Sequence, residues 1–268
     1  MRSVSLVASA VFRETVRDRV PLSIVAFALL LIAASILIGQ LTAGQDLKII
    51  KDLGLAAIRA LGLIIAIFIG IGLVSKEVER RSIYSLLAKP ITRGEFVAAK
   101  YLGLTATLAM NIAAMTLAFY ALLFYMNLVA SDGERASWAA PATDPRILIA
   151  ILLTYGELAV VTAIAVFFST FSSALLSALL TFAMWGAGHF AGDLRDLSSV
   201  LDAPIVEGVA RVVSYLLPNL AAFDIRAEAV YGLPVSPSHI ALTLAYGVLY
   251  SLVFVLLAVA VFRRRDFR

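Results

Sequence analysis

The chain contains no cysteine and only two histidines among its 268 residues. The absence of cysteine excludes structural disulfides, thiolate metal sites and a cysteine nucleophile. Two histidines are too few for most metal-dependent hydrolases, whose metal ions are held by clusters of histidine and carboxylate side chains. Charged residues make up only 15% of the chain, whereas a soluble domain has about a quarter. These shortages exclude an ordinary cytoplasmic enzyme, a secreted disulfide scaffold and a disordered protein.

Hydrophobic residues, by contrast, make up 62% of the chain, so much of its surface must face lipid. A helix needs about 20 apolar residues to cross the hydrocarbon core of a membrane. Six stretches reach that length, at about 20–43, 53–74, 101–129, 147–168, 174–192 and 240–262. They lack the alternation of barrel strands. The sequence therefore predicts an all-α membrane protein that forms a single transmembrane domain over residues 1–268.

The distribution of lysine and arginine predicts how these spans are oriented. Basic residues concentrate in cytoplasmic loops. With the N-terminus inside, residues 1–19, 75–100, 169–173 and 263–268 hold 14 of the 22 basic residues, and the outer loops hold seven. Both termini are therefore predicted to be cytoplasmic. The compact six-span form and this bias fit a bacterial cytoplasmic (inner) membrane.

Two of the segments outside the spans have amphipathic patterns. Val4, Val7 and Val11 lie on one helical face of residues 1–19, which predicts a helix on the inner membrane surface. The largest outer segment, 193–239, carries apolar residues at helical spacing between Ile205 and Leu217. We expect an amphipathic helix there, before the sixth span.

The largest cytoplasmic loop, 75–100, has the pattern of a helix, a sharp turn and a second helix. A short helix is predicted from Glu77 to Ala88, because Pro90 disfavours helical geometry at Lys89. Thr92-Arg93-Gly94-Glu95 then matches a capping box, which starts the next helix. Such a charged elbow is suited to docking a soluble partner. The alternative is a solvated loop that only follows the positive-inside rule.

Short motifs along the whole chain carry a resemblance to a known family. In the cytoplasmic loop they are Glu77-Val78-Glu79-Arg80-Arg81-Ser82, Leu86-Leu87-Ala88-Lys89-Pro90-Ile91-Thr92-Arg93 and Lys100. Elsewhere they are Phe12-Arg13-Glu14, Arg17-Asp18-Arg19, Ser172-Ser173-Ala174-Leu175-Leu176-Ser177, Leu217-Pro218-Asn219-Leu220 and Phe223-Asp224-Ile225-Arg226. The sequence resembles permease subunits of ABC transporters of the ABC-2 type. Within them it is most similar to the group involved in multicopper-enzyme maturation.

This resemblance implies the fold of ABC-2 (type V) exporters, with six transmembrane helices, an N-terminal interfacial helix, a cytoplasmic coupling helix and an outer amphipathic helix. The coupling helix of such permeases docks into a groove of the ATP-binding subunit. The residues that the resemblance assigns to docking are Glu77, Glu79, Arg80, Arg81, Ser82, Leu86, Leu87, Lys89, Pro90 and Arg93.

The expected partners follow from the same resemblance. The chain has no Gly-x-x-x-x-Gly-Lys-Ser/Thr phosphate loop, so ATP and Mg²⁺ are expected on a separate ABC ATP-binding subunit. The chain itself is expected to be a transport subunit and no enzyme, with no bound cofactor, no metal and no nucleic-acid partner. A second permease copy, forming a homodimer, is expected in the membrane, and the family also leaves room for a periplasmic accessory protein.

Three polar residues are predicted at membrane depth. Glu157 lies near the middle of the fourth span, and Arg59 lies in the outer half of the second. A charge at that depth costs about 2.5–3.5 kcal/mol, so each should face protein or water. An Arg59–Glu157 pair satisfies both, as a structural ion pair or as part of a substrate path. His189, near the outer end of the fifth span, is expected to be an interface histidine, and the alternative is a ligand in the same substrate path or ion pair.

Small residues in the fifth span are spaced for close helix packing. They are Ser173, Ser177 and Thr181, with Gly188 and Gly192 further along. Small residues at this spacing let helices approach closely. Two interpretations stay open, namely packing within the chain and a seam between two copies around the translocation path.

The leading hypothesis is the membrane-spanning half of an ABC exporter. The alternatives are a membrane scaffold of an envelope complex that moves nothing, a stand-alone secondary carrier and an intramembrane enzyme. A scaffold needs no polar path, so Glu157 counts against it. The two histidines argue against the enzyme.

Overall fold

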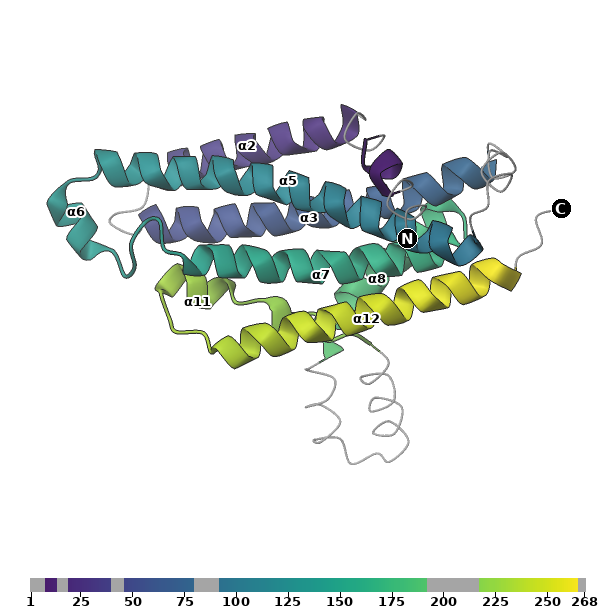
Figure 1. Cartoon of the computed structure of the whole chain (residues 1–268). Coiled ribbons are helices and arrows are strands. Elements are labelled where there is room, and N and C mark those ends of the chain that lie inside the picture. The colour runs from purple at the N-terminus through teal and green to yellow at the C-terminus, as the bar shows by residue number, and fades with distance from the viewer. Residues whose placement is uncertain (1–7, 14–18, 40–45, 80–91, 192–216, 265–268) are drawn as a thin grey trace.

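The computed structural model describes residues 8–13, 19–39, 46–79, 92–191 and 217–264, and these fold into a bundle of helices (Figure 1). The elements are α2 (Arg19–Gly39), α3 (Asp46–Glu79), α5 (Arg93–Val129), α6 (Asp132–Ser137), α7 (Arg146–Ser169), α8 (Ala174–His189), the 3₁₀ turn η1 (Ala221–Phe223), α11 (Arg226–Tyr231) and α12 (Pro237–Arg264). No strand occurs among the described residues. The all-α prediction is confirmed for this part of the chain.

Helices α3 and α7 form the centre of the bundle, with α2 and α5 on one side and α12 on another (Figure 1). In their most apolar windows, 67% of α3 and 61% of α7 is buried, against 22% of α5 and 28% of α12. All four are long and apolar enough to cross a membrane, whereas α8 is a shorter apolar helix. The central pair therefore supplies the core, and the outer helices present apolar side chains outward.

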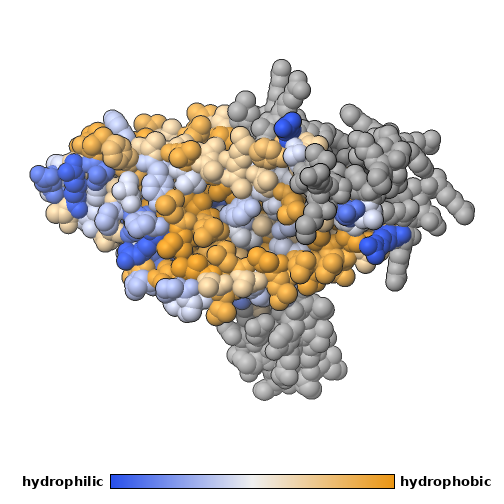
Figure 2. Space-filling view, viewed as in Figure 1, coloured by the Kyte–Doolittle hydropathy of each residue, from blue (hydrophilic) through white to orange (hydrophobic). Residues whose placement is uncertain are grey.

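The exposed surface of the bundle is apolar along its length and polar toward its ends. Figure 2 shows hydrophobic residues over the flank and the most hydrophilic residues near the two ends. Large side chains such as Leu117 and Val248 are 73% and 70% exposed. This pattern is unfavourable in water and fits a hydrocarbon surround. The chain is a multi-pass membrane protein.

Several helices extend beyond the predicted spans. Helix α3 runs unbroken from Asp46 to Glu79, so it replaces both the predicted span 53–74 and the start of a separate helix at Glu77. Helix α5 begins at Arg93, eight residues before the predicted span 101–129. The predicted spans end where the apolar runs end, but lysine, glutamate and arginine favour helix, so helical hydrogen bonding continues through charged residues. For α5 this extension is predicted, because the Thr92 capping box marks the start of the helix.

The start of α5 is fixed by the predicted capping box, which the structure confirms. Thr92 has an extended backbone, and its hydroxyl accepts a hydrogen bond from the Glu95 N–H at 3.3 Å. In return the Thr92 N–H donates to Glu95 Oε2 at 3.0 Å. These two bonds satisfy amide groups that the first helical turn leaves without partners.

Residues 8–13 are helical and pack against the start of α5 and the end of α12. Val11 is 5% exposed, and a Cβ at Gly103 would lie 2.8 Å from both its side chain and the Ala8 carbonyl oxygen. Glycine is therefore required for this close approach. The predicted N-terminal helix is confirmed over these six residues. We call this end of the bundle the inner end, after the predicted orientation, and the opposite end the outer end.

A segment without regular helix, residues 217–225, lies between α7, α8 and α12. The Phe223 ring is buried, and a Cβ at Gly156 or Gly247 would lie 3.2 Å or 3.0 Å from it. The backbone of this segment is hydrogen-bonded, because the Leu220 N–H donates to the Gly188 carbonyl and the Asn219 N–H donates to the Tyr246 hydroxyl. Paired backbone groups allow irregular chain to lie beside the middle of a membrane helix.

Some predicted features lie outside the described residues. These are the loop residues Arg80, Arg81, Ser82, Leu86, Leu87, Lys89 and Pro90, most of the amphipathic helix in 205–217, and Gly192.

Candidate functional site

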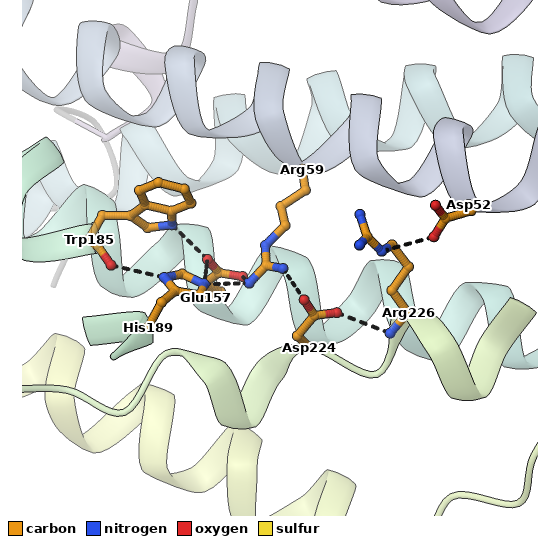
Figure 3. Close-up of polar contacts among 7 residues, drawn as sticks. All are labelled: Asp52, Arg59, Glu157, Trp185, His189, Asp224 and Arg226. Carbon is orange, nitrogen blue, oxygen red and sulfur yellow. Dashed lines mark hydrogen bonds and ion pairs between the residues drawn. The ribbon is translucent and has the colours of Figure 1, made fainter. Parts of the chain in front are cut away.

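Arg59 of α3 is the centre of a charged cluster in the outer half of the bundle (Figure 3). Its Nη2 lies 2.9 Å from Oε2 of Glu157 and 2.6 Å from Nε2 of His189. Its Nη1 donates a hydrogen bond to Oδ2 of Asp224. Only 15% of the Arg59 side chain is exposed, so these contacts replace most of its hydration. One guanidinium therefore joins three other parts of the chain.

Glu157 comes from the middle of α7 and is fully buried. Its Oε1 accepts a hydrogen bond of 2.8 Å from the indole N–H of Trp185 on α8. Among the described residues, its Oε2 has the ion pair with Arg59 and no hydrogen bond. A buried carboxylate is tolerated only when it is paired. The structure thus forms the Arg59–Glu157 pair that the spacing allowed.

His189 is the last residue of α8, and its ring lies close to both Arg59 and Glu157 (Figure 3). Its Nδ1 is 2.9 Å from the Trp185 carbonyl oxygen, and its Nε2 is 3.4 Å from Oε1 of Glu157. The imidazole and indole rings of His189 and Trp185 lie 4.7 Å apart. His189 therefore lies at an interface between helices of the chain, where it links the end of α8 to α3 and α7.

The cluster continues toward the outer surface through Asp224 and Arg226. The Arg226 N–H donates to Oδ1 of Asp224 at 3.1 Å, and Arg226 Nε lies 3.0 Å from Oδ1 of Asp52 on α3. Partial burial of Asp224 opposes its ionisation, but the Arg59 charge and the Arg226 N–H outweigh this and lower the pKa of Asp224. Charges of alternating sign thus run from buried Glu157 to exposed Asp52.

Close packing of α3 on α7 brings these side chains together. A Cβ at Gly62 would lie 2.4 Å from Leu158 Cδ1, and a Cβ at Gly70 would lie 2.6 Å from Ala165 Cβ. Glycines on a shared face let two membrane helices approach closely. Arg59, one turn before Gly62, therefore reaches the carboxylate of Glu157 on the neighbouring helix.

A family comparison gives this geometry its context. A model described as "ABC-2 family transporter protein" matches residues 6–267, nearly the whole chain. The chain belongs to the ABC-2 transporter family. Comparison with curated proteins gives no match. Members of this family are the membrane-spanning permease component of ABC transporters, so the resemblance seen in the short motifs is confirmed at the level of the family.

Membership has two direct consequences for the ABC-2 protein. The permease is a membrane transport component and is not itself catalytic, and an ABC ATP-binding partner is implied. The charged cluster is therefore a feature of a transport protein. Its contacts are ion pairs and hydrogen bonds, and the described residues contain no group of three or more histidine, aspartate or glutamate side chains that could hold a metal ion.

The fifth-span residues predicted for a seam between copies mostly pack inside the chain. Ser177 and Thr181 are fully buried, and their hydroxyls form hydrogen bonds within the segment around α8. Gly188 is buried too, because a Cβ there would lie 2.8 Å from the Pro218 carbonyl oxygen. Packing within the chain is therefore the interpretation that fits these three residues, whereas Ser173 is exposed.

Some of the residues predicted to dock on the ATP-binding subunit are described by the structure, and these lie at the inner end. Glu77 and Glu79 belong to the last turns of α3, and Arg93 is the first residue of α5. The described chain thus enters and leaves residues 80–91 by two helices at the inner end (Figure 1).

Two groups of residues were missed or misjudged from the sequence. Asp224 and Trp185 belong to the cluster, and the only signal for Asp224 was its place in a family motif. Lys51 precedes the predicted span 53–74 and so falls in a predicted outer loop, yet it is 1% exposed in α3, and its Nζ donates to the carbonyl oxygens of Pro141 at 2.6 Å and Ala140 at 3.4 Å. His239 precedes the predicted span 240–262, yet it lies in the first turn of α12.

Proposed function

We propose that the chain is the membrane-spanning permease subunit of an ATP-driven ABC exporter, which works with a separate ATP-binding subunit to move a substrate across the bacterial cytoplasmic membrane. The match to the ABC-2 family over residues 6–267 carries this proposal. The arrangement has six spans: α2, α3, α5, α7, α8 and α12, with both termini cytoplasmic. Residues 75–100 dock on the ATP-binding subunit, which holds ATP and Mg²⁺, and a second copy completes the transporter.

The charged cluster supports transport over a scaffold that moves nothing. A scaffold needs no carboxylate at membrane depth, and burying one is costly. Glu157 instead shares Arg59 with Asp224, which lies in the irregular segment beside α8. Ion pairs between separate elements can be exchanged when those elements move, which is what a transport cycle requires.

An apolar groove supports a hydrophobic or amphipathic cargo. It has a volume of about 490 Å³ and runs between α5, α7 and α12. Among the described residues no charged side chain lines it, and the hydroxyls of Tyr101 and Tyr155 donate to the carbonyl oxygens of Ala159 and Thr105. Gly156 of α7 lies in the groove, whereas Glu157, the next residue, is fully buried and contacts Arg59 and Trp185 instead.

The test is a tagged purification from gently solubilised native membranes, followed by mass spectrometry and an ATPase assay. We expect a stoichiometric partner with a phosphate loop, and its loss when Glu79→Arg and Arg80→Glu reverse the charges of the inner loop. The matched control is Arg135→Glu on α6 at the outer end, which should keep the partner. Recovery of the chain without any ATPase would overturn the proposal and favour a carrier or a scaffold.

A further inference from the structure

The contacts of His189 define its protonation state. Guanidinium N–H groups only donate, so at 2.6 Å from Arg59 Nη2 the Nε2 atom of His189 must accept. A carbonyl oxygen only accepts, so at 2.9 Å from the Trp185 oxygen the Nδ1 atom must carry the hydrogen. Both contacts specify the same species, a neutral imidazole with its hydrogen on Nδ1.

With a neutral His189, the charges at the core of the cluster do not balance. Arg59 contributes one positive charge, and Glu157 and Asp224 contribute one negative charge each. Arg226 and Asp52, next in the series, compensate one another. One added proton would make the core of the cluster neutral, and His189 has the lone pair to accept it.

A proton on Nε2 would also change the contacts. The lone pair that accepts from Arg59 would be lost, and two cations 2.6 Å apart would repel. Oε1 of Glu157 is only 3.4 Å from Nε2, so the protonated ring has an anionic partner within reach. Arg59 keeps Asp224 as its own partner.

We propose that His189 is a proton-binding site at membrane depth, and that its protonation makes Glu157 exchange Arg59 for His189. In the neutral state Arg59 ties α3 to α7, to the end of α8 and to the segment that carries Asp224. In the protonated state His189 adds a second link between α7 and α8 to the hydrogen bond from Trp185 to Glu157, and Arg59 ties α3 only to that segment. The proton reaches the cluster from the outer side, where Asp224 is 35% exposed and His189 is 22% exposed.

Trp185 provides the readout, because its indole N–H donates to Glu157 and its ring lies 4.7 Å from His189. The chain has two tryptophans and two histidines, so Trp138→Phe isolates Trp185 and His239→Gln isolates His189. Fluorescence of the Trp138→Phe protein in lipid nanodiscs is measured from about pH 8 to pH 5, the range in which histidine changes its charge. Substrate and ATP are absent, so this result is independent of the proposed transport function.

We expect a one-proton change in Trp185 fluorescence that is kept in Trp138→Phe/His239→Gln and lost in Trp138→Phe/His189→Gln. A flat titration, or a transition that survives His189→Gln, overturns the proposal. As a second measurement, ¹⁵N spectra of the ring nitrogens in His239→Gln protein should show the Nδ1–H form at about pH 8. A ring with its hydrogen on Nε2 there contradicts the assignment whatever the fluorescence shows.

Discussion

Helix α3 buries two basic residues within eight positions of each other, and the structure treats them differently. Lys51 donates to two backbone carbonyl oxygens of the loop after α6, which cannot titrate and belong to one short segment. Arg59 shares side-chain partners on α7, on α8 and in the segment before α11. We call the contacts of Lys51 with these carbonyl oxygens the Lys51 clamp. The Lys51 residue is 1% exposed, whereas the Arg59 side chain is 15% exposed, so the more deeply buried charge is the one with only backbone partners. The comparison teaches that burial of a charge alone does not indicate function.

The largest effect is expected from Arg59→Leu, which leaves Glu157 buried without a counter-charge. Removing one partner of a buried ion pair costs about 3–5 kcal/mol in the free energy of unfolding. The double variant Arg59→Leu/Glu157→Gln should recover much of this loss, because no buried charge is then left unpaired. Chemical unfolding in mixed micelles measures both. Equal losses in the single and double variants would show that the pair is not the source of the cost.

Lys51→Met should destabilise the protein less and should leave its activity intact. A hydrogen bond from a charged group contributes about 1.5–3 kcal/mol. Only one of the two Lys51 bonds is short, since Nζ lies 2.6 Å from the Pro141 oxygen and 3.4 Å from the Ala140 oxygen. Lys48→Met is the matched control, because the Lys48 ammonium lies 5.2 Å from the Tyr231 ring centre and contributes about 0.5–1 kcal/mol. ATPase activity per folded complex should not change in either variant. A loss of ATPase activity in Lys51→Met but not in Lys48→Met would contradict this prediction, because Lys51 would then matter for activity as well as for stability.

The smallest effect is expected at the outer end of the charge series. The side chains of Arg226 and Asp52 are 41% and 54% exposed, and such an ion pair contributes about 0.2–1 kcal/mol. Arg226→Gln should therefore change the unfolding free energy little, since the hydrogen bond from its backbone N–H to Asp224 remains. A loss of unfolding free energy as large as that of Arg59→Leu would mean that the charges from Glu157 to Asp52 are energetically coupled.

The sequence predicted the positions of the helices well and the contacts between distant side chains poorly. Apolar run length located the cores of α7 and α12 to within a few residues, and the Thr92 capping box was visible as a four-residue motif. The depth of Arg59 and Glu157 made their ion pair possible, because both were placed in the outer half of the membrane and a charge at that depth should face protein or water. The Lys51 clamp had no such signal, because backbone carbonyl acceptors about 90 positions away leave no pattern in the residues. Asp224 was obscure for the same reason, since its contact with Arg59 depends on how the chain folds back after α8.

The central claim is that the Arg59–Glu157–His189 cluster sits where an ATP-driven permease moves, whereas the Lys51 clamp is fixed. Because the chain has no cysteine, paired cysteine variants can be spin-labelled cleanly and diluted with unlabelled copies. Gly186→Cys with Ile64→Cys reports α8 against α3 near the cluster, since a side chain at Gly186 meets nothing within 4 Å. Gly133→Cys with Leu53→Cys reports α6 against α3 near the clamp, and Gly133 is equally open.

The measurement is the distance within each pair by pulsed electron spin resonance, with the ATP-binding subunit present, before and after trapping with ATP, Mg²⁺ and vanadate. The account predicts a changed distance distribution for the Gly186–Ile64 pair and an unchanged one for the Gly133–Leu53 pair. Two unchanged distributions, or a change confined to the clamp pair, would contradict it.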